Sequence, residues 1–353
     1  MDSLQRLKTD YPWIQTPLII GAPMRLIALA DLAVEISKAG GIGFIGAGTD
    51  VADLSSHLEK AKTLLSPPNQ PLKSENNTLP LGVGFINWGA DLVAALPVVA
   101  RFQPAAVWFF AASSLSVLRA ATREVRAAAP STKIWVQVGG VLEAVEVARE
   151  AQPDVLVVQG TDAGGHGRAQ GAGLVALLPE VVDAVSAAAG GGLAPVVVAA
   201  GGIADARGVA AALVLGAGGV VMGTRFLAAE EAVVAKGYRD EVLRAVDGGQ
   251  TTVRTKVWDR CRGTTGWAET HNGRGIINKT YTDALGGMDD DENRKLYEAD
   301  MQKGDEGWGV EARLCTYAGS AVGLVKEVKG AGEIVKEVRE GARALVEGAT
   351  ARL

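Results

Sequence analysis

The chain has 353 residues and a formal charge of −5, with 40 acidic against 35 basic side chains. This mildly negative balance argues against a nucleic-acid-binding protein, which needs basic patches, and no apolar run reaches the roughly 20 residues of a membrane span. The polar start, residues 1–5, does not resemble a signal peptide, and the two cysteines give neither a disulfide framework nor a metal-binding spacing. We therefore expect a soluble protein of a reducing compartment that binds no metal and no nucleic acid and enters no membrane.

Apolar, strand-like runs alternate with helix-compatible segments through the first 226 residues. The predicted strands are residues 18–23, 42–46, 81–86, 106–110, 134–138, 155–158, 195–200 and 219–222. Short apolar runs of this kind are typical of parallel strands buried on both faces. Eight such strands with seven intervening helices match an α/β fold, the (β/α)₈ or TIM barrel. A doubly wound sheet is the competing fold, but no switch point is evident, which favours closure.

The alternation of strands and helices ends after the eighth strand. We expect residues 1–226 to form the barrel and residues 227–312 to form a small, mostly helical second domain that is inserted here and covers the substrate. Residues 313–353 then return to the barrel, and helical periodicity over 319–346 predicts its eighth outer helix. The polar, proline-bearing segment 67–80 predicts a loop between the second and third strands.

A glycine-rich stretch with one histidine follows the sixth strand. It runs from Gln159 to Gly167 and contains Gly164, Gly165 and His166, one of only three histidines in the chain. Glycines let backbone approach a flat ligand closely, and histidine exchanges a proton near neutral pH. Loops after parallel strands also carry the chemistry of α/β folds. We interpret His166 as a candidate catalytic base; a solvated histidine in a turn is the alternative.

Two further glycine runs follow the seventh and eighth strands. The first contains Gly201 and Gly202, and the second contains Met222, Gly223 and Thr224. Barrels commonly bind a phosphate group with the loops after these two strands, using backbone N–H groups and a helix N-terminus. Thr224 adds a hydroxyl donor. Together, the two runs predict a ligand that carries a phosphate.

Several of these motifs resemble the nitronate monooxygenase family, formerly called 2-nitropropane dioxygenases. The likeness runs from about Thr16 to Phe226 and is carried by Ala22-Pro23-Met24, residues 39–43, Asn87, Ala163-Gly164-Gly165-His166, residues 200–203 and residues 222–226. Members of this family are FMN-dependent barrels that oxidise alkyl nitronates with O₂ to a carbonyl compound and nitrite. The resemblance therefore implies an FMN-binding barrel and a small nitronate or nitroalkane substrate.

The resemblance also implies roles for individual residues. His166 would be the catalytic base, or the group that holds the anionic nitronate. The phosphate of FMN would lie on Gly201-Gly202 and Gly223-Thr224. The cofactor-binding residues are expected to be Ala22, Pro23, Met24, Asn87, Gln137, Gln159, Gly164, Gly165, Gly201, Gly202, Met222, Gly223 and Thr224. Two departures stand out: Gln137 takes a place where some relatives carry lysine, and Arg25 follows Met24 where small polar residues are frequent.

Other activities are compatible with the same motifs. The same flavin barrel serves NADH:quinone reductases and enoyl-thioester reductases, and a non-catalytic flavin-binding barrel is a further alternative. A dehydrogenase with a cysteine nucleophile in a barrel loop is disfavoured, because Cys261 and Cys315 both follow the eighth strand. His57 is predicted on the solvent side of a helix, whereas His271, in the second domain, could overhang the pocket.

The remaining expectations concern assembly and location. The chain is expected to be a monomer or a homodimer. A cytoplasmic location is expected, or a peroxisomal one, because the chain ends in Ala351-Arg352-Leu353, a small–basic–leucine tripeptide that resembles the Ser-Lys-Leu peroxisomal address.

Overall fold

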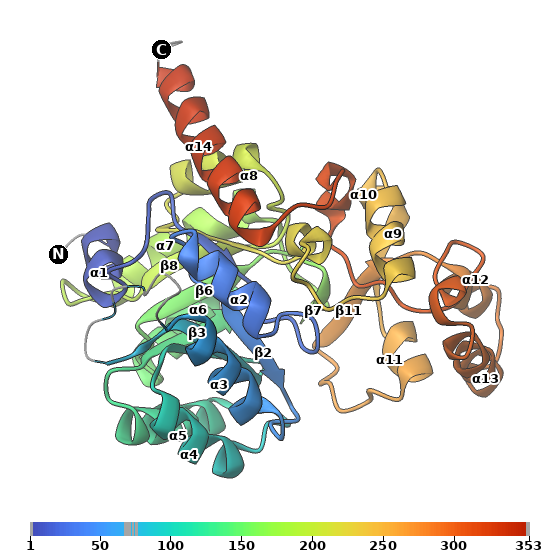
Figure 1. The fold of residues 1–353 in the computed structure, drawn as a ribbon, viewed down its shortest axis with the longest axis horizontal. Helices are drawn as coiled ribbons and strands as arrows, with labels where there is room; N and C mark the ends of the chain where they lie inside the picture. Colours follow the sequence, from blue (N-terminus) through green and yellow to red (C-terminus); the bar gives the residue numbers. More distant parts are fainter. Residues whose placement is uncertain (1–2, 67–71, 73, 75–76, 351–353) are drawn as a thin grey trace.

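The computed structural model describes residues 3–66, 72, 74 and 77–350, and its centre is a barrel of parallel strands (Figure 1). Neighbouring strands follow the order β1-β9-β8-β6-β5-β4-β3-β2. The ring closes where the Gly21 N–H donates to the Ile42 carbonyl at 3.0 Å. The strands are β1 (Ile19–Gly21), β2 (Phe44–Gly48), β3 (Leu79–Ile86), β4 (Pro104–Phe110), β5 (Lys133–Val138), β6 (Val155–Gln159), β8 (Val196–Ala200) and β9 (Val220–Met222). The predicted (β/α)₈ barrel is confirmed. The segment predicted as a loop at 67–80 lies largely outside the described residues.

Helices surround the barrel, one in each connection between strands. They are α2 (Ala30–Lys38), α3 (Leu54–Leu64), α4 (Leu92–Phe102), α5 (Leu115–Ala128), α6 (Val141–Glu150), α7 (Leu174–Ala188) and α8 (Ala206–Val214). The long C-terminal helix α14 (Ala331–Thr350) packs against α2 and α8, between the first and last of these helices (Figure 1). It thereby takes the eighth outer position. None of the helices in the described part of the chain is long and apolar enough to cross a membrane.

Large aromatic side chains fill the barrel interior. Phe44, Trp108 and Trp135 are fully buried there, and the rings of Trp108 and Trp135 stack at a centroid distance of 5.9 Å. Tyr11, just after helix α1 (Ser3–Asp10), accepts a hydrogen bond of 2.6 Å from Trp135 Nε1. This packing fills the barrel near the N-terminal ends of its strands. A ligand can therefore enter only at the C-terminal ends of the strands.

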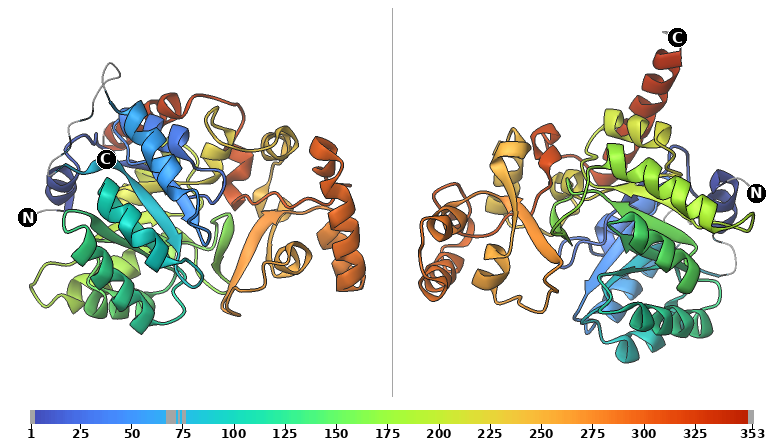
Figure 2. Two further views of the ribbon diagram at one scale, coloured as in Figure 1. Left: turned by 60° about the horizontal axis from the view of Figure 1, so that its bottom comes forward. Right: turned by 180° about the vertical axis from the view of Figure 1, so that it is seen from behind.

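A second unit lies beside the open end of the barrel (Figure 2). Its strands β10 (Thr252–Thr255) and β11 (His271–Ile276) pair antiparallel, and Trp258 and Tyr297 lie in its core. Arg313 donates to Asn293 Oδ1 at 2.9 Å, so the chain still contacts this unit after residue 312. The helices and short 3₁₀ segments between β9 and α14 are η1 (Thr224–Ala228), α9 (Lys236–Arg244), α10 (Gly248–Thr251), α11 (Val257–Arg262), α12 (Lys279–Leu285), α13 (Asp290–Met301), η2 (Gly304–Gly307) and η3 (Ser320–Leu324).

The glycine–histidine stretch is not the simple loop that the sequence predicted. Residues Gly165–Arg168 form strand β7, which pairs antiparallel with β11, so that His166 lies opposite Gly273. Figure 2 shows β7 leaving the barrel to join the sheet of the second unit. The stretch is too short to show strand alternation, and it becomes a strand because its partner supplies the hydrogen bonds.

Candidate active site

A cavity of about 1090 Å³ occupies the open end of the barrel, under the second unit. Loops after β1, β6, β8 and β9 and the side chain of Gln137 in β5 contribute to its wall, as expected for the C-terminal ends of barrel strands. All but two of the predicted site residues line it. Those that do are Ala22, Pro23, Met24, Gln137, Gln159, Gly164, Gly165, His166, Gly201, Gly202, Gly223 and Thr224.

The other two predicted residues, Asn87 and Met222, do not line the cavity. Met222 is fully buried and packs in the core between the strands and the outer helices, because the alternation of β9 turns Val221 inward and Met222 outward. Its carbonyl accepts a hydrogen bond from the Ala22 N–H at 3.0 Å. Asn87 lies between two residues that do line the cavity, Ile86 and Trp88. Both polar atoms of the buried Asn87 amide lack a hydrogen-bond partner within the described part of the chain.

The turn after β8 requires glycine. Gly201 and Gly202 have φ values of +98° and +75°, a left-handed conformation that other residues adopt at a cost. A Cβ on Gly201 would lie 2.9 Å from the Gly160 carbonyl oxygen, and one on Gly202 would lie 3.0 Å from Asp162 Cβ. Backbone N–H groups of such turns can face an anion directly, since no side chain stands in front of them.

Thr224, after β9, is fixed by a loop from the far end of the chain. Its Oγ1 accepts from the Gly319 N–H at 2.9 Å, which leaves the hydroxyl proton available to a ligand. The next residue, Ser320, donates through Oγ to Asp162 Oδ1 at 2.6 Å. The segment 319–320 therefore joins the loops after β6 and β9, the two loops that flank the glycine turn after β8.

His166 is held on two sides by residues of the second unit. Its Nε2 lies 2.7 Å from Asp259 Oδ1, and its ring stacks on the indole of Trp267 with centroids 3.9 Å apart. Only 11% of its side chain is exposed. Neither Asp259 nor Trp267 was singled out as a site residue from the sequence, because no motif surrounds them.

The charges around His166 favour its neutral form. Burial lowers the pKa of His166 below its ordinary value, and the guanidinium groups of Arg262 and Arg254 act in the same direction. The hydrogen bond and the charge of Asp259 oppose this shift without reversing it. A neutral imidazole has an unprotonated nitrogen, which is what a general base needs.

Arg254 keeps the histidine strand in place. Its guanidinium donates to the carbonyl oxygens of Ala163 at 2.6 Å, Asn272 at 2.7 Å and Gly165 at 3.2 Å. Burial and the neighbouring Arg274 lower the pKa of Arg254 to about 10, so it remains charged at neutral pH. It is a structural cation under the loop rather than a residue facing the cavity.

The other two histidines differ in position. His57 is in α3, on the outside of the barrel, and does not line the cavity. His271 is buried in β11, with Nδ1 3.0 Å from Thr270 Oγ1. Burial and the cations around it, Arg168 first among them, lower the pKa of His271 to about 4. His271 is therefore neutral near pH 7.

Both cysteines line the cavity, which the sequence did not predict. They are buried and free. Burial raises the pKa of the Cys315 thiol to about 12 and also raises that of Cys261. Protonated thiols are poor nucleophiles, so their presence in the wall does not restore the cysteine-dependent dehydrogenase.

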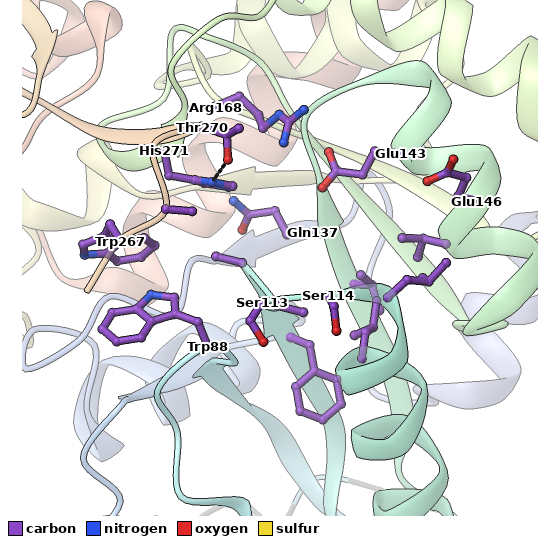
Figure 3. A pocket seen from close by; sticks show the side chains of 18 of the residues that line it. Trp88, Ser113, Ser114, Gln137, Glu143, Glu146, Arg168, Trp267, Thr270 and His271 are labelled. Carbon is purple, nitrogen blue, oxygen red and sulfur yellow. Dashed lines mark hydrogen bonds between the residues drawn. The ribbon is translucent and has the colours of Figure 1, made fainter. Parts of the chain in front are cut away.

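A smaller side cavity of about 420 Å³ adjoins the first one (Figure 3). Trp88, Gln137, Gly266 and Trp267 line both cavities and form the wall between them. Its other polar lining residues include Ser113, Ser114, Glu143, Glu146, Arg168 and Thr270. Among residues 3–66, 72, 74 and 77–350, no three His, Cys, Asp or Glu side chains lie together as a metal site would need.

Comparison with known proteins gives a consistent result. A family model described as nitronate monooxygenase matches residues 98–341. The chain is 46% identical to nitronate monooxygenase npaC of Metarhizium robertsii, covering 99% of this chain and 97% of that protein. It is 39% identical to a nitronate monooxygenase of Neurospora crassa, covering 97% and 93%. Its fold is similar to the structure of FabK from Thermotoga maritima, with a TM-score of 0.75, 24% identity and 99% of both chains covered.

Proposed function

Since the chain belongs to the nitronate monooxygenase family of oxidoreductases, we propose that it is an FMN-dependent enzyme that converts alkyl nitronates and O₂ into a carbonyl compound and nitrite. The observation that carries this proposal is the position of His166. A neutral, oriented imidazole faces the same cavity as the glycine turn at the ends of β8 and β9. A proton acceptor and a glycine turn suited to an anion thus line the same cavity.

The residues present fit FMN. The turn at Gly201-Gly202, together with Gly223 and the free hydroxyl proton of Thr224, suits a phosphate group. The buried amide of Asn87 has no hydrogen-bond partner in the described residues, but Asn87 does not line the cavity, so its contact with FMN stays a prediction. Gln137 and Gln159 add side-chain amides to the wall.

When bound, FMN supplies the electron acceptor and the reactivity toward O₂. The protein contributes orientation, charge and exclusion of water. His166 can accept a proton from the carbon next to a nitro group, or hold the anion that results. We further propose that residues 227–312 cover the substrate, since Arg262 and Trp267 of this unit form part of the cavity wall above the barrel.

A reductase that uses the same FMN site is the second candidate. One side of the cavity is apolar, with Leu227, Val233, Val234, Tyr238 and Trp308 in its wall, and it gives room to a substrate larger than a short nitronate. This feature favours an NADH:quinone or enoyl-thioester reductase if nicotinamide cofactors reduce the enzyme. A non-catalytic flavin carrier is disfavoured, because it has no need for an oriented base.

The cofactor and the electron donor can be tested on one sample. The purified protein should be yellow, with about one FMN per chain, as expected for one phosphate site formed by Gly201-Gly202, Gly223 and Thr224. Without oxygen, a primary nitronate should bleach the flavin absorbance rapidly, and NADH should not. A colourless protein that does not take up FMN would contradict the proposed cofactor, whereas rapid bleaching by NADH followed by reoxidation with a quinone would establish the reductase.

A further inference from the structure

Asp259 is a buried carboxylate that no other part of the described fold needs as an ion-pair partner. It lies in α11 and is 2% exposed. Its Oδ1 contacts His166 Nε2 at 2.7 Å and accepts from Thr264 Oγ1 at 2.8 Å, while Oδ2 has no hydrogen-bond partner in the described residues. Burial of a carboxylate is costly unless its partners compensate. The principal compensation here is the catalytic candidate itself.

The contact decides which nitrogen of His166 carries the proton. A carboxylate only accepts hydrogen bonds, so the ring nitrogen that faces it, Nε2, must be the protonated one. Among the described residues, none hydrogen-bonds the second nitrogen, Nδ1. With the ring in the cavity wall and stacked on Trp267, Nδ1 is left as the unprotonated nitrogen.

Asp259 is also the carboxylate that balances the cations near His166. The charged and titratable groups that face this histidine come from four segments around it; they are Asp259 and Arg262 from α11, Arg254 from β10, His271 from β11 and Tyr317. Two of these five groups are permanent cations. Without the carboxylate, a positive charge on His166 would meet only repulsion or neutral neighbours.

We propose that Asp259 is a positioning residue that keeps the His166 proton on Nε2, so that Nδ1 can remove the proton from a neutral nitroalkane. The inference rests on the proposed function. In this step the C–H bond next to the nitro group breaks and its proton forms a bond to Nδ1. The electron pair stays on the substrate and delocalises into the nitro group, which gives the nitronate. The imidazolium that results is stabilised by the Asp259 carboxylate.

The proposal predicts a difference between two substrates. A nitronate has already lost the proton, so it does not need this step, whereas a nitroalkane does. In Asp259→Asn the side-chain amide can donate to Nε2, which favours the tautomer with the proton on Nδ1 and removes the base. Turnover of the nitroalkane should fall by roughly 10²- to 10⁴-fold. The loss on the matching nitronate should be smaller by at least about tenfold, since binding and flavin chemistry remain.

Asp290→Asn is the matched control. Asp290 is exposed at the start of α13 and pairs at 2.9 Å with Arg260 of α11, the helix that carries Asp259, so this variant removes a nearby carboxylate without touching His166. It should leave both activities unchanged. Equal losses on nitroalkane and nitronate in Asp259→Asn, with FMN still bound, would overturn the positioning role and leave a structural one.

A second readout does not depend on turnover. Nitrogen-15 NMR of the holoenzyme, labelled at histidine, reports which ring nitrogen carries the proton, and the His166 signals are identified by their absence in His166→Asn. The wild-type enzyme should show a protonated Nε2 and a bare Nδ1, and Asp259→Asn should show the reverse. A wild-type enzyme with the proton on Nδ1 would overturn the proposal, even if Asp259→Asn failed to fold. Should the enzyme show the expected tautomer but no nitronate oxidation, the proposed function would fail and the assignment of Asp259 as the residue that sets the tautomer would stand.

Discussion

The imidazole of His166 lies flat against the indole of Trp267, with ring centroids 3.9 Å apart and planes inclined by 5°. The two residues belong to different parts of the fold, since His166 is on the strand that leaves the barrel and Trp267 is on the loop before β11. Trp267 also contacts Trp88, at a centroid distance of 5.7 Å, and separates the two cavities. This stack orients the histidine ring from its face, while Asp259 orients it from its edge.

Removing the stack should slow the enzyme without emptying the cofactor site. Aromatic stacking contributes about 0.5–1.5 kcal/mol, which corresponds to roughly 2- to 10-fold in rate if all of it holds the ring in place. Trp267→Ala should lower kcat on a nitroalkane by this amount, and Trp267→Phe, which keeps a ring, should lose less. Steady-state kinetics at equal FMN content measure the effect. Identical kcat values for Trp267→Ala and the wild type would contradict a positioning role.

The glycine turn after β8 should be necessary for cofactor binding rather than only for folding. Gly202→Ala places a Cβ 3.0 Å from Asp162 at a φ of +75°, and should weaken FMN binding by at least about tenfold, the effect of 1.4 kcal/mol. Gly191→Ala is the control, because Gly191 has a similar φ of +88° but open space around it. Both changes should lower the free energy of unfolding by about 1–2 kcal/mol. Titration of the two apoprotein variants with FMN measures the difference in affinity. Equal affinities of Gly202→Ala and Gly191→Ala would argue against a phosphate site at the turn after β8.

The pH dependence should report a single base with a depressed pKa. Only the neutral form of His166 can accept a proton, so kcat/KM for a freshly dissolved nitroalkane should be constant above the pKa of His166 and fall as the pH drops through it. Because burial lowers that pKa, the fall should begin below the ordinary histidine value, and the rate should decrease about tenfold per pH unit beyond it. His166→Asn should abolish this dependence, whereas His57→Asn should retain it. A profile whose midpoint lies above the ordinary histidine pKa would contradict the buried, cation-flanked environment.

The C-terminal tripeptide, Ala351 to Leu353, lies outside the described residues, and a peroxisomal location remains a proposal. The residues before it, 343–350, are exposed at the end of α14. In a eukaryotic cell, a fluorescent protein fused to the N-terminus should colocalise with a peroxisomal marker, and deletion of the tripeptide should disperse it. A fusion that is already diffuse with the tripeptide intact would support the cytoplasmic alternative.

Local patterns in the sequence predict the barrel and most of its mouth. Each strand is a short apolar run, and the ends of β5, β6, β8 and β9 carry glycines or amides that line the cavity, so the position of residues such as Gly202 and Gln159 follows from strand order alone. The alternation of side chains along β9 also contains the information that Met222 points away from the cavity. The family motif covers Met222, Gly223 and Thr224 together, so it does not distinguish the residues that face the cavity from the one that does not.

The surroundings of His166 could not be predicted in this way. Asp259 is 93 positions away from it in the chain, and no periodicity or spacing links them. Strand β7 likewise depends on β11, whose residues begin more than a hundred positions later. The orientation of the catalytic candidate is therefore a tertiary property, set by how the second unit docks on the barrel.

The most direct test of the proposed function is to measure O₂ consumption and nitrite release together, with a short primary nitronate as substrate under air. We expect both to occur with the FMN-loaded enzyme, a carbonyl product to accumulate in proportion to nitrite, and NADH with a quinone to give little turnover in the same preparation. Nitrite release close to the rate without enzyme, together with rapid NADH-dependent quinone reduction, would contradict nitronate oxidation and assign the same cavity to a reductase.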